Sequence, residues 1–583
     1  MFKKNLQKIK FSVIIILVFT LGVFAEKHQV DKKFSQFLND RIDKTYQSFY
    51  SAFSKKKIYI YIEPRHYENI LEVRDLALKN TMLTKDLEDW VPARITLKNN
   101  AKKFKIKIWF DNLYRDIFGK VGQDELLQNL TDWIPPEIIS DKNAPNIKIR
   151  LKGVWPEHWT DENQWSFKIK FIDDKNSILD LERMALQPPR TLDYLYEWVL
   201  SKALKKEKLI YLPVSFSEII LNSQSIGVYT IQGQISDEIL IKNKRPIGPI
   251  IGFTKDTWIE EQINAKKLYD LGAIDSLNGL EETFWRTKIE PVRFNSSKTN
   301  TKQEEYLKKS IYLLESFRKK ELKTSEVFDI DKLSKVMALK ALLGSTEFDP
   351  LDTKFYLNPK SLLLEPIVKE AHVNLDMNWK ENYYSWWIDS SKIRPHYTNN
   401  TNFFIDLLYS DKVFYEKYLN QLKIYSSNNY FQDLINENRD EFDKNMRMLK
   451  YNYPTKKIFS FEQIDTTKIR VQDLLSPVQG INVYFKNSRN NEVKLSVHNI
   501  QRLPIEILGL ELENQEKIYN KELIFIPGKK PLDSSKETEI KLNCKNNINC
   551  NKSNIGKQKI LFRILGQNIE KKTLISPYYT GNN

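Results

Sequence analysis

Cysteine is nearly absent from the 583-residue chain, which excludes a small fold held together by many disulfides. Only Cys544 and Cys550 occur, in a polar stretch near the end of the sequence. In an oxidising compartment this pair predicts one small disulfide that closes a loop. A zinc site is the alternative, but no histidine lies at metal-ligand spacing from the two thiols, so the disulfide is favoured.

Glycine and proline are also scarce, at 17 and 22 residues, which excludes a collagenous or linker-like chain. The content of 41% hydrophobic and 28% charged residues is typical of folded protein, and at about 150 residues per domain the length predicts about two to four domains. There are 91 basic and 75 acidic residues, a formal net charge of +16. Because the two signs are interleaved and no recognition module occurs, we expect no nucleic-acid partner.

The common catalytic motifs are missing. The sequence contains no G-x-x-x-x-G-K-[ST] loop, no G-x-G-x-x-G after a predicted strand, no H-R-D or D-F-G triplet and no G-x-S-x-G elbow. Its six histidines are scattered and form no H-E-x-x-H pair, so a zinc hydrolase is not supported.

The only long apolar run lies at the N-terminus. Basic residues at positions 3, 4, 8 and 10 precede an apolar stretch over 11–25 that ends in Val23-Phe24-Ala25. This pattern predicts a signal peptide that is cleaved after Ala25, and therefore a protein exported to the periplasm, the outer envelope or the medium of a bacterium. An uncleaved anchor is the alternative, although the run is shorter than the roughly 20 residues that span a bilayer. We expect no transmembrane span beyond this segment.

Alternating apolar and polar residues predict strands over 58–62, 93–97, 104–109, 147–152 and 165–171. In the last two strands one face is apolar, and the other bears Arg150 and Lys152 on the first strand and Lys168 and Lys170 on the second. Helices are predicted over 117–133, 192–206, 258–271, 302–322 and 330–343, and further strands over 210–220, 226–231, 354–357 and 362–368. From about residue 460, short strands separated by turn residues indicate a C-terminal β-sandwich.

An ordered set of short blocks resembles the CotH family of atypical secreted kinases, named for a spore-coat protein. The first block is Arg-Leu-Lys-Gly-Val-Trp-Pro-Glu-His over 150–158, followed by Gln-Trp-Ser-Phe-Lys-Ile-Lys over 164–170. Later blocks that resemble the family lie at 186–189, 196–198, 219–222, 227–229, 248–253, 354–359 and 364–367. The resemblance covers residues 57 to about 375.

This resemblance implies a divergent protein-kinase-like core, and with the strand pattern after residue 460 the expected fold is α+β with a C-terminal antiparallel β-sandwich domain. The expected organisation is a signal peptide (1–25), a leader (26–56), an N-terminal β-rich region (57–145), the core (146–455) and the sandwich (456–583). The implied activity is transfer of the γ-phosphoryl group of ATP to Ser or Thr of an envelope or surface protein, with Mg²⁺ or Mn²⁺ as cofactor.

The resemblance also implies roles for individual residues, because phosphoryl transfer needs cations at the phosphates and carboxylates at the metal. Lys168 or Lys170 is the expected phosphate-binding lysine, with Arg150 and Lys152 as second candidates for the ATP site. Asp352 is an expected catalytic carboxylate, and Asp349 is a further candidate in the same loop, for which a turn-initiating role before Pro350 is the alternative. Asp352 and Glu370 are the expected metal ligands.

The sequence departs from the family pattern at several of these positions. Val154 stands where many members have an acid, and Gln232 and Gly233 replace a Glu-Glu pair. Asp352 replaces an Asn, and Glu370 replaces an Asp. The alternative is therefore a degenerate pseudokinase that acts as a surface assembly or binding protein, with a protein or a glycan as partner.

Five aromatic residues between 379 and 387 form a further cluster that could stack on sugar rings. Packing inside the protein is the alternative for this cluster, which consists of Trp379, Tyr383, Tyr384, Trp386 and Trp387.

Overall fold

The structure is a computed structural model. It describes residues 57–80, 82–83, 89–98, 146–172, 181–271, 283–292, 301–345, 348–373, 399–476, 479–489, 492–528, 537–543 and 552–578. The predicted signal peptide and leader, the strand over 104–109, the helix over 117–133, the aromatic cluster and the cysteine pair lie outside the described residues. The described chain contains helices together with largely antiparallel sheets, which confirms the α+β class.

The chain forms two compact units. Unit 1 takes the described residues up to Ser201, together with Leu212–Ile239 and Ile435–Ser460. Unit 2 takes Lys202–Tyr211, Leu240–Leu434 and the residues from Phe461 onward.

Unit 1 is built around a closed β-barrel. Its strands are hydrogen-bonded in the order β1-β2-β3-β4-β5-β7-β6, and a parallel pairing of β6 with β1 closes the ring. Closure removes the free strand edges that an open sheet would expose. The strands are β1 (Lys57–Tyr61), β2 (Val91–Lys98), β3 (Asn146–Leu151), β4 (Phe167–Phe171), β5 (Arg183–Gln187), β6 (Val214–Leu221) and β7 (Gln224–Gly233).

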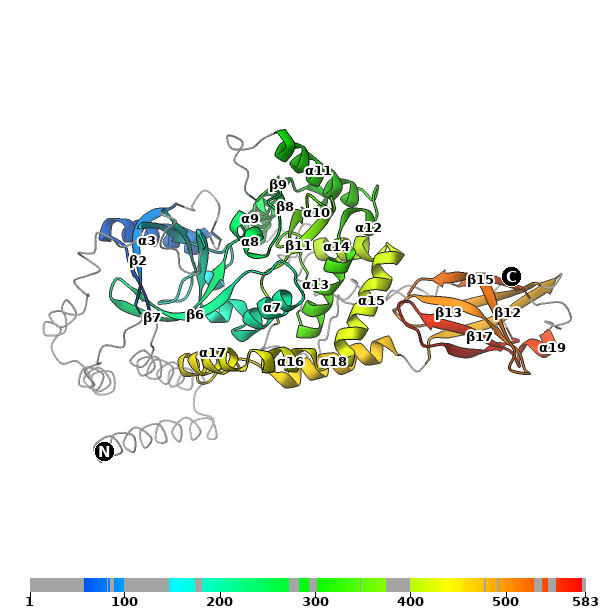
Figure 1. Cartoon of the computed structure of the whole chain (residues 1–583). Coiled ribbons are helices and arrows are strands. Elements are labelled where there is room, and N and C mark those ends of the chain that lie inside the picture. The colour runs from blue at the N-terminus through cyan, green and yellow to red at the C-terminus, as the bar shows by residue number, and fades with distance from the viewer. Residues whose placement is uncertain are drawn as a thin grey trace, which may run out of the picture. The chain divides into compact units, whose positions relative to one another are not determined.

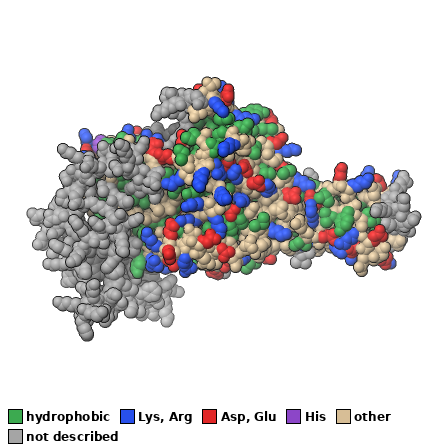
Figure 2. Space-filling view, viewed as in Figure 1, with side chains coloured by type: hydrophobic (Ala, Val, Ile, Leu, Met, Phe, Trp, Pro, Cys, Tyr) green, Lys and Arg blue, Asp and Glu red, His purple; other side chains and the backbone are tan. Residues whose placement is uncertain are grey.

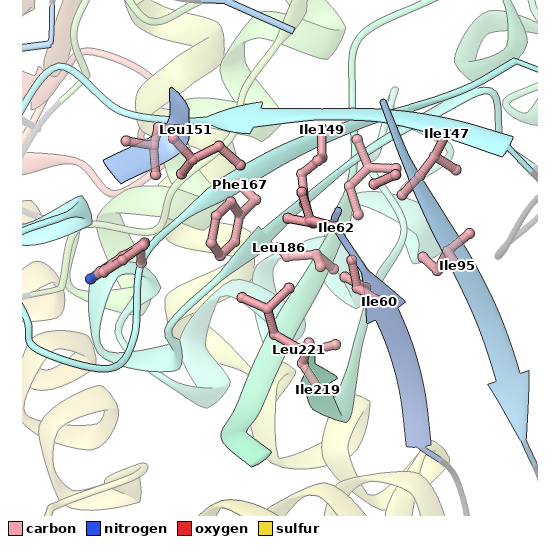
Figure 3. Close-up of a cluster of buried hydrophobic side chains, with 14 of the residues drawn as sticks. Ile60, Ile62, Ile95, Ile147, Ile149, Leu151, Phe167, Leu186, Ile219 and Leu221 are labelled. Carbon is pink, nitrogen blue, oxygen red and sulfur yellow. The ribbon is translucent and has the colours of Figure 1, made fainter. Parts of the chain in front are cut away.

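The barrel interior is filled by apolar side chains, as Figure 3 shows for residues from β1 to β6 that point toward one another between the strands. Ile147, Ile149 and Leu151 of β3 are buried there, so the period-two prediction is confirmed for this strand. The register pairs Arg150 with Lys168 across β3 and β4, so the two basic stripes lie side by side on the outer face. The barrel interior is therefore a packed apolar core. Polar side chains that could bind a ligand in this unit lie on the outer face of the barrel or at its ends.

Helices and short 3₁₀ turns complete unit 1. The helices are α3 (Pro64–Asn80), the first part of α7 (Leu195–Lys206) and α17 (Arg439–Asn452), and the turns are η2 (Pro156–His158) and η5 (Pro189–Leu192). The indole of Trp198 on α7 packs against Phe442 of α17 and donates a hydrogen bond to Glu441, 3.0 Å away. This contact anchors the start of α7, which bears Glu197, a residue of the polar chain described below.

Unit 2 contains a four-stranded antiparallel sheet in the order β11-β10-β8-β9. The strands are β8 (Ile250–Phe253), β9 (Ile289–Pro291), β10 (Lys354–Leu357) and β11 (Leu364–Ile367). The helices of this unit are α9 (Asp256–Asp270), α10 (Thr283–Arg286), α11 (Thr301–Arg318), α12 (Thr324–Val327), α13 (Ile330–Leu343), α14 (Asn399–Tyr409), α15 (Lys412–Ser427) and α18 (Phe461–Leu475). The helices α8 (Asp237–Lys242) and α16 (Tyr430–Glu437) each contain a point in the sequence where the chain passes from one unit to the other.

The helix α13 is the centre of this helical layer and packs beside α15 and α18 (Figure 1). It begins after Asp329, whose carboxylate accepts a hydrogen bond from the backbone of Lys332, and ends at Gly344 in the left-handed conformation. These two signals explain why the sequence pattern predicted its bounds, 330–343, correctly. No described helix is long and apolar enough to cross a membrane.

The C-terminal strands, orange to red in Figure 1, form a seven-stranded sheet in the order β15-β14-β17-β18-β12-β13-β16. They begin at Ile481, after α18, and buried residues from both halves of this order share one hydrophobic core. All neighbours pair antiparallel except β12 with β18. The elements are β12 (Ile481–Arg489), β13 (Glu492–Asn499), β14 (Ile505–Glu511), β15 (Lys517–Ile526), β16 (Thr538–Asn543), α19 (Lys552–Ile555), β17 (Lys559–Ile564) and β18 (Lys571–Ser576).

Charged side chains of both signs are interspersed on the face of the molecule shown in Figure 2. The groups that matter for chemistry are therefore recognised by burial and pairing, not by a large patch of one sign.

Candidate functional site

A charge centre lies at one end of the four-stranded sheet of unit 2. The strand β10 is antiparallel to both β8 and β11, so the residues that precede β10 lie beside those that follow β8 and β11. Asp352 precedes β10, Lys255 follows β8, and Lys369 and Glu370 follow β11. The topology thus brings four charged residues together from three distant segments; with Lys354, the first residue of β10, they are called the charge centre below.

The carboxylates of the charge centre are bound by lysines. The Lys255 ammonium lies 2.7 Å from Oδ1 and 2.8 Å from Oδ2 of Asp352, so it contacts both oxygens of that carboxylate. Lys369 lies 2.9 Å from Oε1 of Glu370 and 3.4 Å from Oδ1 of Asp352. Oε2 of Glu370 faces Nε2 of His372 at 3.2 Å. The result is a network in which each acid has at least one cationic neighbour.

The segment that bears Glu370 is held in an unusual backbone conformation. Glu370 and His372 have φ values of +61° and +48°, in the left-handed region that non-glycine residues seldom adopt. The carbonyl oxygen of Glu370 accepts a hydrogen bond of 3.1 Å from the ammonium of Lys340 on α13. Such conformations persist only where surrounding contacts hold them, and they are concentrated at functional sites.

Asp349 lies in the same loop as Asp352 and shapes it. Its Oδ1 accepts a hydrogen bond of 2.8 Å from the backbone of Leu351, two residues on, which is the geometry of an Asx turn. Its carbonyl oxygen accepts bonds from the backbone and hydroxyl of Thr353, at 3.0 and 2.8 Å. Asp349 therefore sets the turn and also adds negative charge near Lys255 and Lys354.

The environment shifts the pKa values of the centre in opposite directions. Burial alone would raise the pKa of Asp352, but the ammonium groups of Lys255 and Lys369 outweigh burial and hold it well below its usual range. Burial would lower the pKa values of Lys255 and Lys369, but their carboxylate partners raise both above the usual value. These three groups are therefore charged at neutral pH.

Lys354 behaves differently from the other lysines. Burial lowers the pKa of its amine to about 8; Asp352 opposes this shift, while Lys255 and Lys369 add to it. Its Nζ donates hydrogen bonds to two carbonyl oxygens, those of Leu351 at 2.7 Å and Phe253 at 3.2 Å. A neutral amine still has two N–H donors, so both bonds survive loss of the proton.

The geometry does not fit the divalent metal that the family resemblance implies at Asp352 and Glu370. Magnesium and manganese need carboxylate oxygens turned toward the ion. Here both oxygens of Asp352 face Lys255, and those of Glu370 face Lys369 and His372. Across the described part of the chain, no group of three or more His, Cys, Asp or Glu residues is arranged to hold a metal ion.

The predicted ATP-site cations lie in unit 1, on the outer face of the barrel, where Lys152 begins a buried polar chain. Its ammonium lies 2.5 Å from Oε1 of Gln187, and the Gln187 amide donates to Oε1 of Gln232 over a long 3.4 Å. The Gln232 amide in turn donates to Oε1 of Glu197 at 2.7 Å. All four side chains are buried. Two amides therefore link a lysine to a carboxylate through a series of hydrogen bonds; we call these four residues the polar chain.

The other three predicted cations differ in burial and in their neighbours. The Arg150 guanidinium is buried over the ring of Trp90, 5.0 Å from its centroid. Lys168 is half-buried opposite Arg150 on β4. Lys170 is 39% exposed, and its ammonium lies 3.7 Å from Glu182, the spacing of a weak surface pair. Of the four, Lys152 has the environment that most resembles a functional lysine.

Gly153 fixes the loop that follows Lys152. Its φ is +98°, and an added Cβ would lie 2.0 Å from Cδ2 of His158. The indole of Trp159 donates to the Gly153 carbonyl at 3.1 Å, and Nδ1 of His158 lies 2.9 Å from the hydroxyl of Ser166. This part of the first block is therefore explained by close packing around the glycine.

The structure brings Asp349, Asp352 and Glu370 to one sheet end, and it places Arg150, Lys152, Lys168 and Lys170 on the outer face of the barrel. Sequence reasoning missed the lysines of the charge centre and two members of the polar chain. The available signal was position: Lys255 follows the block at 248–253 by two residues, Lys354 opens the block at 354–359, and Lys369 follows the block at 364–367 by two residues. Gln187 and Glu197 lie inside blocks. In comparisons with known proteins, no family model and no curated protein matches the chain.

Proposed function

We propose that this chain is an exported CotH-like kinase that transfers the γ-phosphoryl group of ATP to Ser or Thr residues of an envelope or surface protein. The proposal includes a divergent kinase-like core over 146–455 and a C-terminal β-sandwich. The observation that supports it best is the charge centre: Asp352 and Glu370, singled out by the resemblance, and Asp349 of the same loop meet Lys255 from a third segment, and the pKa values there are strongly perturbed.

The chemistry asked of these residues is mainly positioning and charge neutralisation. A substrate hydroxyl oxygen attacks the γ-phosphorus, the bond to the β-phosphate oxygen breaks, ADP leaves, and the hydroxyl proton passes to a carboxylate. Asp349 is the proposed acceptor, because both oxygens of Asp352 are bound by Lys255. Asp352 then acts through the lysines that it orients. The divalent metal implied by the resemblance does not fit this geometry and takes no part in the proposed step.

The decisive experiment uses the purified chain from residue 26 onward and measures ATP binding by calorimetry and thermal shift, and phosphate incorporation by mass spectrometry. A ligand that binds only the folded state raises its stability by mass action. We expect ATP to stabilise the protein, and phosphate to appear on the chain itself or on added envelope protein. Asp349→Asn should abolish incorporation and retain ATP binding.

The control variant is Asp331→Asn, which removes the same charge from an exposed position on α13, where the side chain is 71% accessible. Its incorporation should equal that of the wild type. Absence of ATP binding under every condition would refute the kinase proposal.

A second candidate function, a pseudokinase that serves as a surface assembly or binding protein with a protein or glycan partner, is favoured by one specific observation. Lys255 contacts both oxygens of Asp352, so this carboxylate is bound by a lysine where the resemblance implies a metal ion. ATP binding without any phosphate incorporation would support this candidate against the kinase.

We also propose export with cleavage after Ala25. N-terminal sequencing of the protein recovered from the envelope or medium should begin at Glu26. Recovery of an intact N-terminus would favour the anchored alternative.

A further inference from the structure

The charge centre supplies its own cations. Asp352 and Glu370 are neutralised by Lys255 and Lys369, which lie within 2.7 to 2.9 Å of them. Lys369 also lies 3.4 Å from Asp352, so it bridges the two acids. Its ammonium thus lies between two carboxylates, the position that a divalent ion occupies in a metal site.

The centre is also open to a ligand. The side chains of Lys255, Lys369 and Asp352 are 30%, 24% and 23% exposed. An ammonium has three N–H donors. Among the described residues, Lys255 contacts the two oxygens of Asp352, and Lys369 contacts one oxygen each of Asp352 and Glu370. One N–H donor of each ammonium is therefore left for a further acceptor.

We propose that Lys255 and Lys369 take the place of a divalent cation, so that unit 2 binds the phosphate groups of a nucleotide without metal. The choice of ATP as the ligand rests on the proposed function. The inference that lysines replace the metal rests only on the contacts of Asp352 and Glu370. Asp352 and Glu370 position the two ammonium groups in this arrangement and leave no oxygen pair for Mg²⁺ or Mn²⁺.

The first test measures ATP and tripolyphosphate binding by calorimetry in EDTA and again with Mg²⁺ or Mn²⁺. We expect wild-type affinity to change less than about threefold between these conditions. Lys255→Gln and Lys369→Gln should each weaken binding about tenfold in EDTA, the loss expected for one charge-assisted contact. Metal should restore part of that loss, because each substitution frees a carboxylate.

The matched control is Lys335→Gln. Lys335 also belongs to unit 2, is similarly exposed, and pairs at 2.8 Å with Glu207, which is not a member of the charge centre. Its affinity should equal that of the wild type in every buffer. ATP binding that appears only with metal would overturn the proposal.

The second test uses Mn²⁺ alone, followed by electron paramagnetic resonance, and does not depend on nucleotide binding. The wild type and Asp352→Asn should bind the same amount of Mn²⁺, because Asp352 is not a metal ligand in the wild type. The double variant Lys255→Gln/Lys369→Gln should gain a Mn²⁺ site. Wild-type Mn²⁺ binding that is lost in Asp352→Asn would overturn the proposal, and so would a folded double variant that gains none. If ATP fails to bind at all, the kinase proposal fails and this second test still decides the metal question.

Discussion

Lys354 gives the sharpest quantitative prediction, because its amine is the one lysine of the charge centre whose proton is held weakly. Burial lowers its pKa from 10.5 to about 8 in the folded chain. The unfolded chain therefore binds more protons between these pH values, and folding stability rises with pH through this window. The free-energy cost of burying Lys354 in its protonated form is fully present below pH 8 and disappears above pH 10.5.

The size of this effect follows from the shift. A lowering from 10.5 to about 8 corresponds to about 3 kcal/mol in total, of which about 2 kcal/mol falls between pH 8 and about pH 10. In Lys354→Met this pH dependence is lost. The hydrogen bonds to Leu351 and Phe253 are lost as well, but that cost is independent of pH and cancels when only the slopes are compared.

The assay is hydrogen exchange at the amides of β10, read by mass spectrometry and corrected for the intrinsic pH dependence of exchange, because a two-unit chain has no single free energy of unfolding. The wild type should gain about 2 kcal/mol relative to Lys354→Met between pH 8 and about pH 10. Lys255 and Lys369 have raised pKa values and lose stabilisation only above the usual range, which lies beyond this pH window. Lys557→Met is the control, since its side chain is 60% exposed. Parallel curves for wild type and Lys354→Met would refute the argument.

Three further substitutions test the packing and polar contacts. Gly153→Ala places a Cβ 2.0 Å from the His158 ring at a φ of +98°, so it should cost more than about 1 kcal/mol and speed hydrogen exchange in β3 and β4; unchanged exchange would contradict the close packing. Glu506→Gln removes the charge of a carboxylate that is 2% exposed and paired with two cations, so it should destabilise β14 by about 2 kcal/mol at neutral pH. Because these cations hold the pKa of Glu506 below its usual value despite burial, its stabilisation is lost as the pH falls through the folded pKa, and wild type and variant should converge in acid-titrated exchange. Gln232→Leu removes the 2.7 Å donor of the buried Glu197 and should destabilise β7 by about 2 kcal/mol, seen as faster hydrogen exchange in β7; unchanged exchange would show that the polar chain is not needed for stability.

Much of the barrel could be predicted from the sequence, because alternation over 147–152 and 165–171 identifies both the strands and their buried faces. The pairing of β1 with β6 could not be predicted, since alternation says which face is buried and not which strand is the neighbour. The strand β8 was also missed, because four buried residues in a row have no period. Short apolar runs of this kind are ambiguous between strand and helix until their partners are known.

The same reason explains why the acids of the charge centre were predicted and their lysines were not. Asp352 and Glu370 stand in or beside blocks that resemble a known family, whereas Lys255 is 97 residues from Asp352 and meets it only because β8 and β10 are neighbours. A carboxylate by itself is compatible with a metal, a lysine or a substrate proton, and the choice depends on which cation the fold delivers. Here each of the two strands that flank β10 is followed, two residues on, by a lysine, so the topology supplies two fixed positive charges at the point where the family resemblance implies a metal ion. Replacing those lysines is therefore a more direct test of the site than replacing its acids. An acid-to-amide change weakens a metal site and a lysine-balanced site alike. A lysine-to-glutamine change weakens the lysine-balanced site and creates a metal site.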